Sequence, residues 1–149
     1  MESSIWFDVI GVIAVILLVL ANGFFVAAEF SLVSVRRTRI AELVARGDKS
    51  AESVQEAINN PDRVIAATQL GITLSSLALG WIGEPAVAHL IEPVIDWLPL
   101  PFQTGFSYTL AAALAFTLIT FLHVVVGELA PKSIALQNPE NTYNVFKIK

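Results

Sequence analysis

The sequence predicts an all-α membrane protein with three transmembrane helices and short interfacial helices. Two observations support this fold class: 55% of the 149 residues are apolar while only 15% are charged, and the apolar residues gather in three long stretches. A soluble domain usually carries about a quarter of its residues as charged side chains. Each stretch can cross a hydrocarbon layer of roughly 30 Å, which takes about 20 helical residues.

The expected transmembrane domain covers residues 1–149, with spans at 9–35, 64–82 and 106–129, an interfacial helix at 50–59 and an interfacial segment at 83–105. The first stretch could instead be a signal peptide, but no Lys or Arg precedes it and its apolar run is too long. In the interfacial helix, apolar and polar residues alternate at helical spacing. The segment 83–105 holds four prolines and three acids, which favours short interfacial helices over a fourth span.

The basic residues predict the orientation of the chain in the membrane. Six of the nine Lys and Arg residues lie between the first two spans and three follow the third. Loops rich in Lys and Arg stay in the cytoplasm. We therefore expect a multi-pass protein of the cell inner (plasma) membrane, with its N-terminus outside and its C-terminus cytoplasmic. The basic residues are Arg36, Arg37, Arg39, Arg46, Lys49 and Arg63, then Lys132, Lys147 and Lys149.

Composition also argues against several classes of function. The net charge of −4 argues against nucleic-acid binding through a basic surface. The absence of cysteine excludes disulfides and thiolate metal sites. The sequence has no nucleotide-binding glycine loop and no nucleophile elbow. We therefore expect no catalytic and no cofactor-binding residues, and an enzyme is disfavoured.

Two acidic residues, Glu29 and Glu128, fall within the predicted spans. An ionised carboxylate near the centre of a span costs roughly 2.5 to 3.5 kcal/mol, so such residues usually have a function. Both spans enter from the outside and both acids precede the cytoplasmic ends, so they can share a cavity. Glu29 could line an ion path below Asn22, or it could accept hydrogen bonds in a structural role.

A second signal is the run Gly127-Glu-Leu-Ala-Pro-Lys at the end of the third span. Pro131 cannot donate to the Gly127 carbonyl, and its ring pushes that turn open. A free carbonyl beside a carboxylate would suit a hard cation such as Mg²⁺ or Na⁺. In the alternative interpretation, the helix simply ends at the proline and Glu128 pairs with Lys132 at position i+4.

Several neutral polar residues lie near these acids. Gln69, Thr73, Ser76 and Gly80 share one helical face of the second span, where they can hydrogen-bond to neighbouring helices. Ser31 can offer a hydroxyl ligand or bond back to its own helix. His123 lies one turn before Gly127 and could be proton-sensitive, but a lone histidine is a weak zinc signal. For assembly, small residues offer close-packing surfaces at Ala111, Ala112 and Ala115 and at Gly71 with Ser75.

Three ordered motifs carry a resemblance to a known family. They are Asn22-Gly-Phe-Phe-Val-Ala-Ala-Glu-Phe-Ser-Leu-Val, Thr68-Gln-Leu-Gly-Ile-Thr-Leu and Gly127-Glu-Leu-Ala-Pro-Lys. Together they resemble the membrane domain of the CorC/CNNM (hemolysin C-like) family over nearly the whole chain. The resemblance implies a homodimer of three-span protomers with an interfacial helical belt. It also implies export of Mg²⁺, the bound substrate, coupled to Na⁺.

The resemblance also implies a set of metal ligands in a cytoplasm-facing cavity. Glu128 would supply charge, the adjoining turn a carbonyl and the other spans neutral oxygens, while Glu29 would support the site or bind Na⁺. The expected metal site is Glu128, Gly127, Ser76, Ser31, Thr73 and Glu29.

The chain departs from the family pattern in two places. Many members have Ser-Glu-Thr at residues 28–30 and Gly-Asn at residues 71–72, where this chain has Ala-Glu-Phe and Gly-Ile, so one oxygen ligand is missing. Another divalent ion or a polyamine is therefore an alternative cargo, and a non-transporting scaffold or accessory subunit is an alternative function. The family usually continues into cytosolic CBS modules; this chain contains none, as expected of a truncated chain or a shortened relative.

Overall fold

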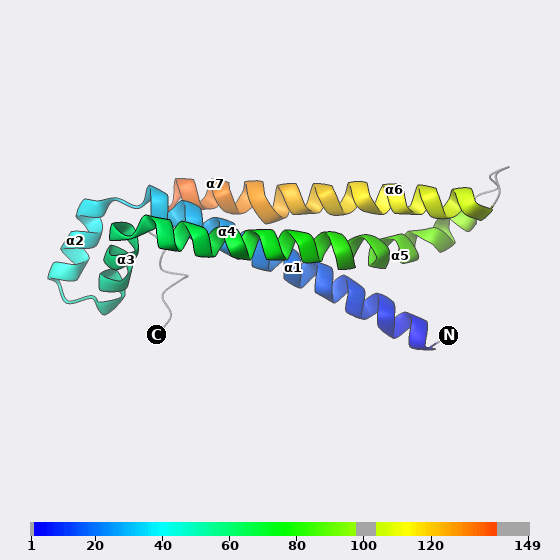
Figure 1. Cartoon of the computed structure of the whole chain (residues 1–149), viewed down its shortest axis with the longest axis horizontal. Helices are drawn as coiled ribbons and strands as arrows, with labels where there is room; N and C mark the ends of the chain where they lie inside the picture. The colour runs from blue at the N-terminus through cyan, green and yellow to red at the C-terminus, as the bar shows by residue number, and fades with distance from the viewer. Residues whose placement is uncertain (1, 98–103, 140–149) are drawn as a thin grey trace.

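The computed structural model describes residues 2–97 and 104–139, which form helices and contain no strand (Figure 1). The helices are α1 (Glu2–Ser34), α2 (Arg37–Ala45), α3 (Lys49–Asn59), α4 (Pro61–Ala78), α5 (Glu84–Asp96), α6 (Thr104–Leu122) and α7 (Ala130–Gln137). Two π-helical turns, η1 (Leu79–Gly83) and η2 (His123–Leu129), join α4 to α5 and α6 to α7.

Three helical stretches are long and apolar enough to cross a membrane: Asp8–Ser34, Pro61–Asp96 and Phe106–Gln137. This confirms the predicted all-α fold class. The second stretch runs through η1 into α5, so the helix continues past the expected end at residue 82. Its 36 residues would extend about 54 Å at 1.5 Å per residue, more than the roughly 30 Å of hydrocarbon. Only part of this helix can therefore lie within the lipid core.

α1 packs against α4 and also against η2 and α7, whereas α5 packs against α6. α6, η2 and α7 form one nearly straight rod, which α1 crosses obliquely (Figure 1). A buried apolar cluster holds them together: Val15 and Val19 of α1, Leu79 of η1 and Ile119 of α6. Burial of each such side chain contributes about 1.5 to 3 kcal/mol where water is the reference solvent.

Most of the small residues that could serve assembly are buried within this chain. A Cβ added at Gly71 would lie 2.6 Å from the Phe25 ring, so this glycine lets α4 approach α1 closely. Ala111 and Ala115 of α6 are fully buried, and Ser75 of α4 is also buried. Close helix packing through small residues is typical of membrane proteins.

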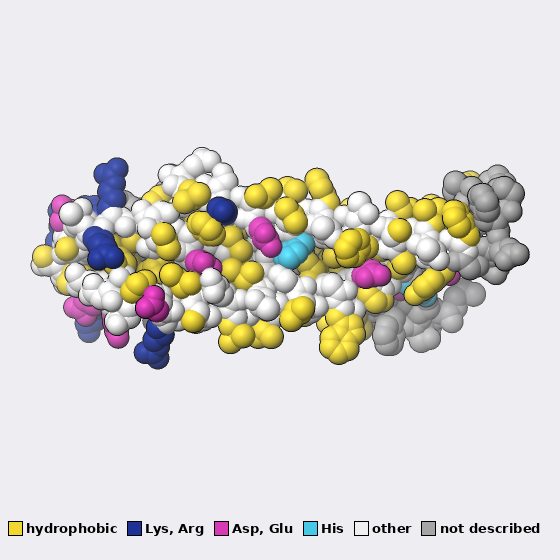
Figure 2. Space-filling view, turned by 45° about the horizontal axis from the view of Figure 1, so that its top comes forward, with side chains coloured by type: hydrophobic (Ala, Val, Ile, Leu, Met, Phe, Trp, Pro, Cys, Tyr) yellow, Lys and Arg dark blue, Asp and Glu magenta, His cyan; other side chains and the backbone are white. Residues whose placement is uncertain are grey.

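A helical hairpin of α2 and α3 lies at one end of the long helices (Figure 1). Gly47 between them adopts φ +82°, a left-handed conformation that favours glycine. The Asp48 carboxylate then caps α3 by accepting a 2.9 Å hydrogen bond from the Ser50 amide. The apolar face of α3 packs against α2 and the end of α1 through Val35, Ile40, Ala51 and Ile58. Lys and Arg side chains gather at this end (Figure 2).

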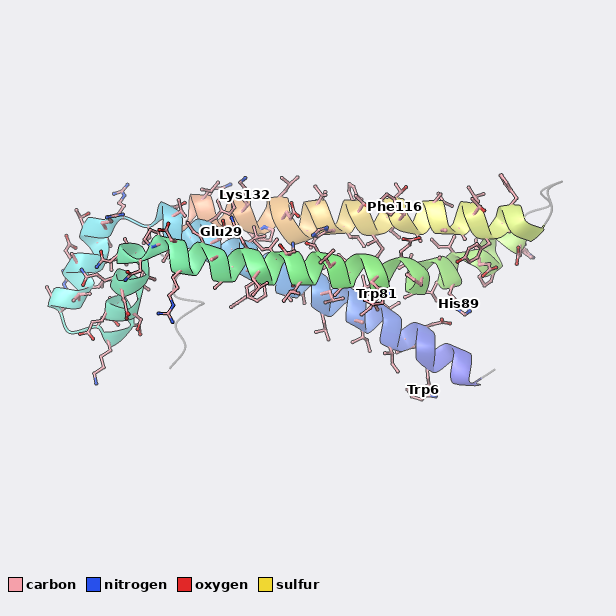
Figure 3. The ribbon with its side chains drawn as sticks, in the orientation of Figure 1. Trp6, Glu29, Trp81, His89, Phe116 and Lys132 are labelled. Atoms are coloured by element: carbon pink, nitrogen blue, oxygen red, sulfur yellow. The ribbon has the colours of Figure 1, made fainter. Side chains whose placement is uncertain are left out.

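The opposite half of the molecule carries exposed tryptophans. Trp6, Trp81 and Trp97 all point away from the helices, as expected of side chains that anchor at a membrane interface (Figure 3 labels the first two). The His89 Nδ1 atom lies 2.8 Å from the Asp8 carboxylate and ties α5 to α1. In the segment 83–105, the structure describes α5 but not residues 98–103. Lys147 and Lys149 also lie outside the described residues.

Candidate functional site

The site is built around the π-helical turn η2. The sequence predicts an opened turn before Pro131, and here the Ala130 amide donates to the Val125 carbonyl, five residues earlier. This wider turn accommodates the proline ring, which would clash with the Gly127 carbonyl in a regular α-helix. The helix therefore continues into α7 instead of ending. Such π turns occur frequently at functional sites.

The Gly127 carbonyl, released from regular helix bonding, is bound by α1. The Asn22 side-chain amide donates a 3.0 Å hydrogen bond to it, and Asn22 is completely buried. A carbonyl can only accept, so the amide nitrogen of Asn22 faces Gly127 and its oxygen faces away. That oxygen accepts a 3.3 Å hydrogen bond from the Ser76 hydroxyl of α4. One asparagine thus links three membrane helices.

The network extends from Ser76 to the acid in η2. The Ser76 oxygen lies 3.0 Å from Nε2 of His123, and the same nitrogen lies 3.3 Å from the Glu128 carboxylate. Because the Ser76 hydrogen points to Asn22, its oxygen accepts from His123, which places a proton on Nε2. This assignment follows from the network rather than from observed hydrogens. With these assignments the donors run from His123 through Ser76 and Asn22 to the Gly127 carbonyl. The Glu128 carboxylate, whose side chain is 43% exposed, competes with Ser76 for the single Nε2 hydrogen.

A pocket of about 310 Å³ adjoins this network. Glu29 and Glu128, from the first and third spans, both line it, together with the Gln69 side chain of α4. Lys132 also lines the pocket, and its ammonium lies 4.5 Å from the centre of the Phe30 ring. Figure 3 shows Glu29 and Lys132 close together where α1 meets α7. With both acids ionised, the three charged groups leave the pocket with a net charge of −1.

The Glu29 carboxylate has a neighbour that the sequence analysis did not single out. Its Oε2 atom lies 3.3 Å from the Thr68 hydroxyl of α4. That hydroxyl also lies 3.1 and 3.0 Å from the carbonyls of Val64 and Ile65, and its single hydrogen can serve one acceptor at a time. The Glu29 carboxylate therefore shares this hydrogen with two carbonyls, and Glu29 also lines the pocket.

The structure groups the predicted site residues in three ways. Glu29 and Glu128 line the pocket, whereas Gly127 and Ser76 belong to the buried network beside it. Ser31 is buried and donates a 3.0 Å hydrogen bond to the Ala28 carbonyl of its own helix, so its hydroxyl is already used. Thr73 is exposed and is not among the residues that line the pocket.

Among the described residues, Glu128 and Lys132 do not form the ion pair that the alternative interpretation expects. Within the described residues, Glu128 is paired with His123, while the Lys132 ammonium lies over Phe30. The described part of the chain holds no cluster of three or more His, Cys, Asp or Glu side chains that could bind a metal. Two carboxylates with neutral oxygens still suit Mg²⁺, because this ion usually keeps several waters and binds through one or two carboxylates.

The central position of Asn22 went unrecognised in the sequence, although a signal for it exists. Asn22 is a polar residue in the middle of an apolar run, and Gly23 follows it. A Cβ on Gly23 would lie 3.0 Å from Cγ of Pro131. The glycine therefore permits α1 to approach η2 and α7 closely enough for the Asn22 amide to reach Gly127.

Helical topology and site together define a multi-pass membrane protein with an acidic pocket between its spans. The chain belongs to the family described as the cyclin M transmembrane N-terminal domain (CNNM), whose profile matches residues 12–146. This confirms the resemblance drawn from the motifs. Membership indicates a function related to membrane transport, and the family is associated with transport rather than catalysis.

Curated bacterial relatives are similar over most of this chain. The UPF0053 proteins YhdT and YhdP of Bacillus subtilis are 46% and 40% identical over 133 and 139 residues, which cover 89% and 93% of the chain. The uncharacterized protein Rv1841c of Mycobacterium tuberculosis is 40% identical over 132 residues, or 88% of the chain. These matches cover 28%, 31% and 36% of the respective relatives, so the chain spans about a third of their length.

Proposed function

We propose that this membrane domain transports divalent cations and exports Mg²⁺ in exchange for Na⁺, with the ion bound in the pocket between Glu29 and Glu128. One observation carries the proposal: two carboxylates from different spans line one pocket. Placing two acids in apolar helices is costly unless a cation or water compensates their charge. The family's association with transport supports the same conclusion.

Without a bound ion, the groups that we propose as Mg²⁺ ligands have neighbours within the chain. The Asn22 amide donates to the Gly127 carbonyl, Nε2 of His123 lies 3.3 Å from the Glu128 carboxylate, and Lys132 lines the pocket. The carbonyl retains a second lone pair. We infer that Mg²⁺ binds both carboxylates, keeps several waters and displaces the Lys132 ammonium through like-charge repulsion. Na⁺ carries half the charge of Mg²⁺ and would repel the Lys132 ammonium less. Exchange of Mg²⁺ for Na⁺ would therefore let the ammonium return to the pocket, which favours export of Mg²⁺.

Assembly is part of the proposal. A single chain surrounds its pocket with three helices and leaves many large apolar side chains exposed, which lipid or a second copy can cover. We propose a homodimer in the bilayer, with the α2–α3 end in the cytoplasm. No nucleic acid takes part.

The test is the effect of Mg²⁺ on the melting temperature of the purified chain in detergent. Binding to the folded state stabilises it by about 1.4 kcal/mol when the ion concentration is ten times the Kd. Millimolar Mg²⁺ should raise the Tm of the unaltered chain, and Glu128→Gln should lose most of this shift. Glu56→Gln removes the same charge from an exposed position in α3 and should keep the full shift.

Two outcomes would contradict the proposal. If Mg²⁺ raises the Tm of Glu128→Gln as much as that of the unaltered chain, Glu128 is excluded as a ligand. No shift in the unaltered chain would favour the non-transporting scaffold. Transport itself is tested in proteoliposomes, where an opposing Na⁺ gradient should accelerate Mg²⁺ flux.

One observation favours an organic polycation as a second candidate cargo. The Lys132 ammonium already lies over the Phe30 ring in a pocket lined by two acids, an environment that suits amines. If a polyamine is the cargo, spermidine should raise the Tm at lower concentration than Mg²⁺. Phe30→Leu should then weaken spermidine more than Mg²⁺.

A further inference from the structure

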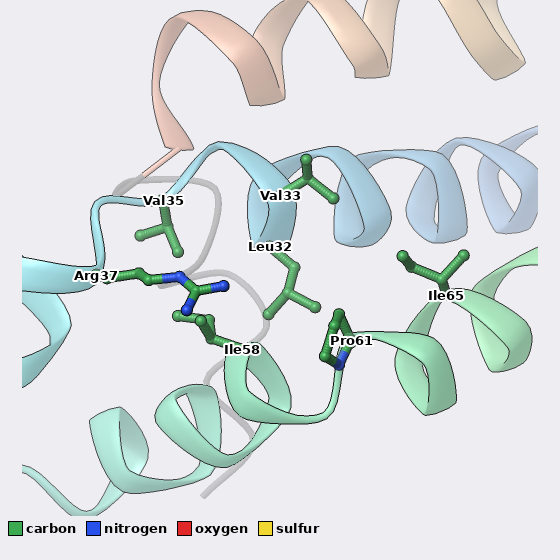
Figure 4. A pocket seen from close by; sticks show the side chains of 7 residues that line it. All are labelled: Leu32, Val33, Val35, Arg37, Ile58, Pro61 and Ile65. Atoms are coloured by element: carbon green, nitrogen blue, oxygen red, sulfur yellow. The ribbon is translucent and has the colours of Figure 1, made fainter.

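A second pocket, of about 250 Å³, lies where α1 and α4 meet the α2–α3 hairpin (Figure 4). Its walls are apolar and come from Leu32, Val33 and Val35 at the end of the first span, Ile58 of α3, and Pro61 and Ile65 at the start of the second. The first span ends at Ser34 and the second begins at Pro61. The pocket therefore lies at the level of two span ends, where lipid headgroups meet hydrocarbon.

Arg37 provides the charged group that lines this pocket. Its side chain extends past Val35 and Ile58 in Figure 4. Within the described chain its guanidinium has no hydrogen bond or ion pair, whereas the nearby Arg39 is paired with Glu42 at 3.0 Å. Among the described residues, no acid lines the pocket. An anionic group at this position would therefore be attracted to Arg37 without a competing carboxylate from this part of the chain.

We propose that this pocket binds an anionic phospholipid, with its phosphate on Arg37 and part of an acyl chain against the apolar wall. Guanidinium groups bind phosphate through charge-assisted, often bidentate hydrogen bonds. Basic pockets between transmembrane helices are a known form of lipid headgroup site. The apolar wall favours a lipid over a free phosphate, because an acyl chain would cover this surface whereas a phosphate alone would leave it exposed to water. The bound lipid would join α1, α2 and α4 at the root of the hairpin.

The experiment is native mass spectrometry of the detergent-purified chain with added phosphatidylglycerol, phosphatidylcholine or sn-glycerol 3-phosphate, without Mg²⁺. We expect phosphatidylglycerol to stay bound at low stoichiometry, with phosphatidylcholine bound more weakly and glycerol phosphate not retained. Arg37→Gln should reduce phosphatidylglycerol affinity about tenfold, the effect of losing one charge-assisted contact. Arg46→Gln, the same change at the far end of α2, should leave it unchanged.

A second variant tests the apolar wall. Val33 is exposed, so Val33→Trp can be accommodated without repacking the helices and would narrow the pocket. It should lower phosphatidylglycerol retention while Arg37 is intact. Three results would overturn the proposal: equal retention of both lipids, equal loss in both arginine variants, or no lipid retention together with an Arg37-dependent change in oligomeric mass. The last would show that protein occupies the pocket. Circular dichroism of each variant checks that it has folded.

Discussion

At the scale of single residues, Asn22 determines how the three membrane helices meet. It is fully buried and uses both ends of its amide, one on Gly127 and one on Ser76. A buried polar group that loses its partner costs about 1 to 3 kcal/mol, although hydrogen bonds between membrane helices average less than those in water-soluble proteins. Asn22 therefore combines a structural role with control of a carbonyl that a cation could use.

Replacing Asn22 by leucine should destabilise the chain. The substitution keeps the branching of the side chain but leaves the Gly127 carbonyl and the Ser76 hydroxyl without this partner, so we expect a loss of about 1 to 3 kcal/mol. The measurement is the free energy of unfolding in mixed detergent. Thr73→Val on the exposed face of α4 is the matched control and should change stability by less than about 0.5 kcal/mol. A similar effect of the two substitutions would contradict the assigned role of Asn22.

The sequence could predict only those features of the candidate site that follow from the depth of a residue in the membrane. Glu29 and Glu128 were expected to lie at similar depth, where they can share a cavity, because both precede the cytoplasmic ends of their spans; the structure has them in one pocket. The contacts of Asn22 could not be predicted, because they depend on which helix faces which and on a non-α turn. The hydroxyl of Ser31 had two open interpretations, and its bond to the Ala28 carbonyl favours the structural one.

At the scale of elements, both π-helical turns occur just before a proline. η1 ends at Gly83, two residues before Pro85, and η2 ends at Leu129, two residues before Pro131. In each case a wider turn relieves the clash between the proline ring and the carbonyl four residues earlier. The sequence pattern alone suggests that a helix ends at such a proline. The actual continuation depends on tertiary packing, which supplies partners such as Asn22 for the released carbonyls.

η2 contains one glycine, Gly127, and η1 contains two, Gly80 and Gly83. Gly127 and Gly80 differ in what surrounds them. A Cβ at Gly127 would lie 3.2 Å from Nδ2 of Asn22 and 3.3 Å from the His123 ring, whereas a Cβ at Gly80 would meet nothing within 4 Å. Asn22 cannot move away without lengthening its own hydrogen bond. Gly127→Ala should therefore destabilise the chain by about 1 to 3 kcal/mol.

Gly80→Ala is the control for this prediction, since it makes the same change in the other π turn. It should be neutral or should stabilise by up to about 1 kcal/mol through higher helix propensity. Both variants are compared by thermal unfolding in detergent, without Mg²⁺. If Gly127→Ala proves as stable as Gly80→Ala, the contact between α1 and η2 is looser than the structure indicates.

At the scale of the whole molecule, the two ends differ in chemistry. Lys and Arg gather around α2 and α3, and exposed tryptophans are spread over the opposite half (Figures 2 and 3). The number of spans and this asymmetry were predictable because hydrophobic length and basic residues act independently of detailed packing. The α2 helix was not predicted, because short helices depend on tertiary packing, here the burial of Ile40 in the cluster shared with α3.

This asymmetry predicts the orientation of the chain, with α2 and α3 in the cytoplasm and the end of α5 outside. The chain has no cysteine, so a single introduced thiol reports on its own location. Ser53 in α3 and Asp96 at the end of α5 are both exposed and polar. In spheroplasts, a membrane-impermeant maleimide should label Asp96→Cys directly and Ser53→Cys only after permeabilisation. The reverse pattern would invert the topology and place the Glu29–Glu128 pocket toward the outer face, where it would receive ions for uptake rather than for export.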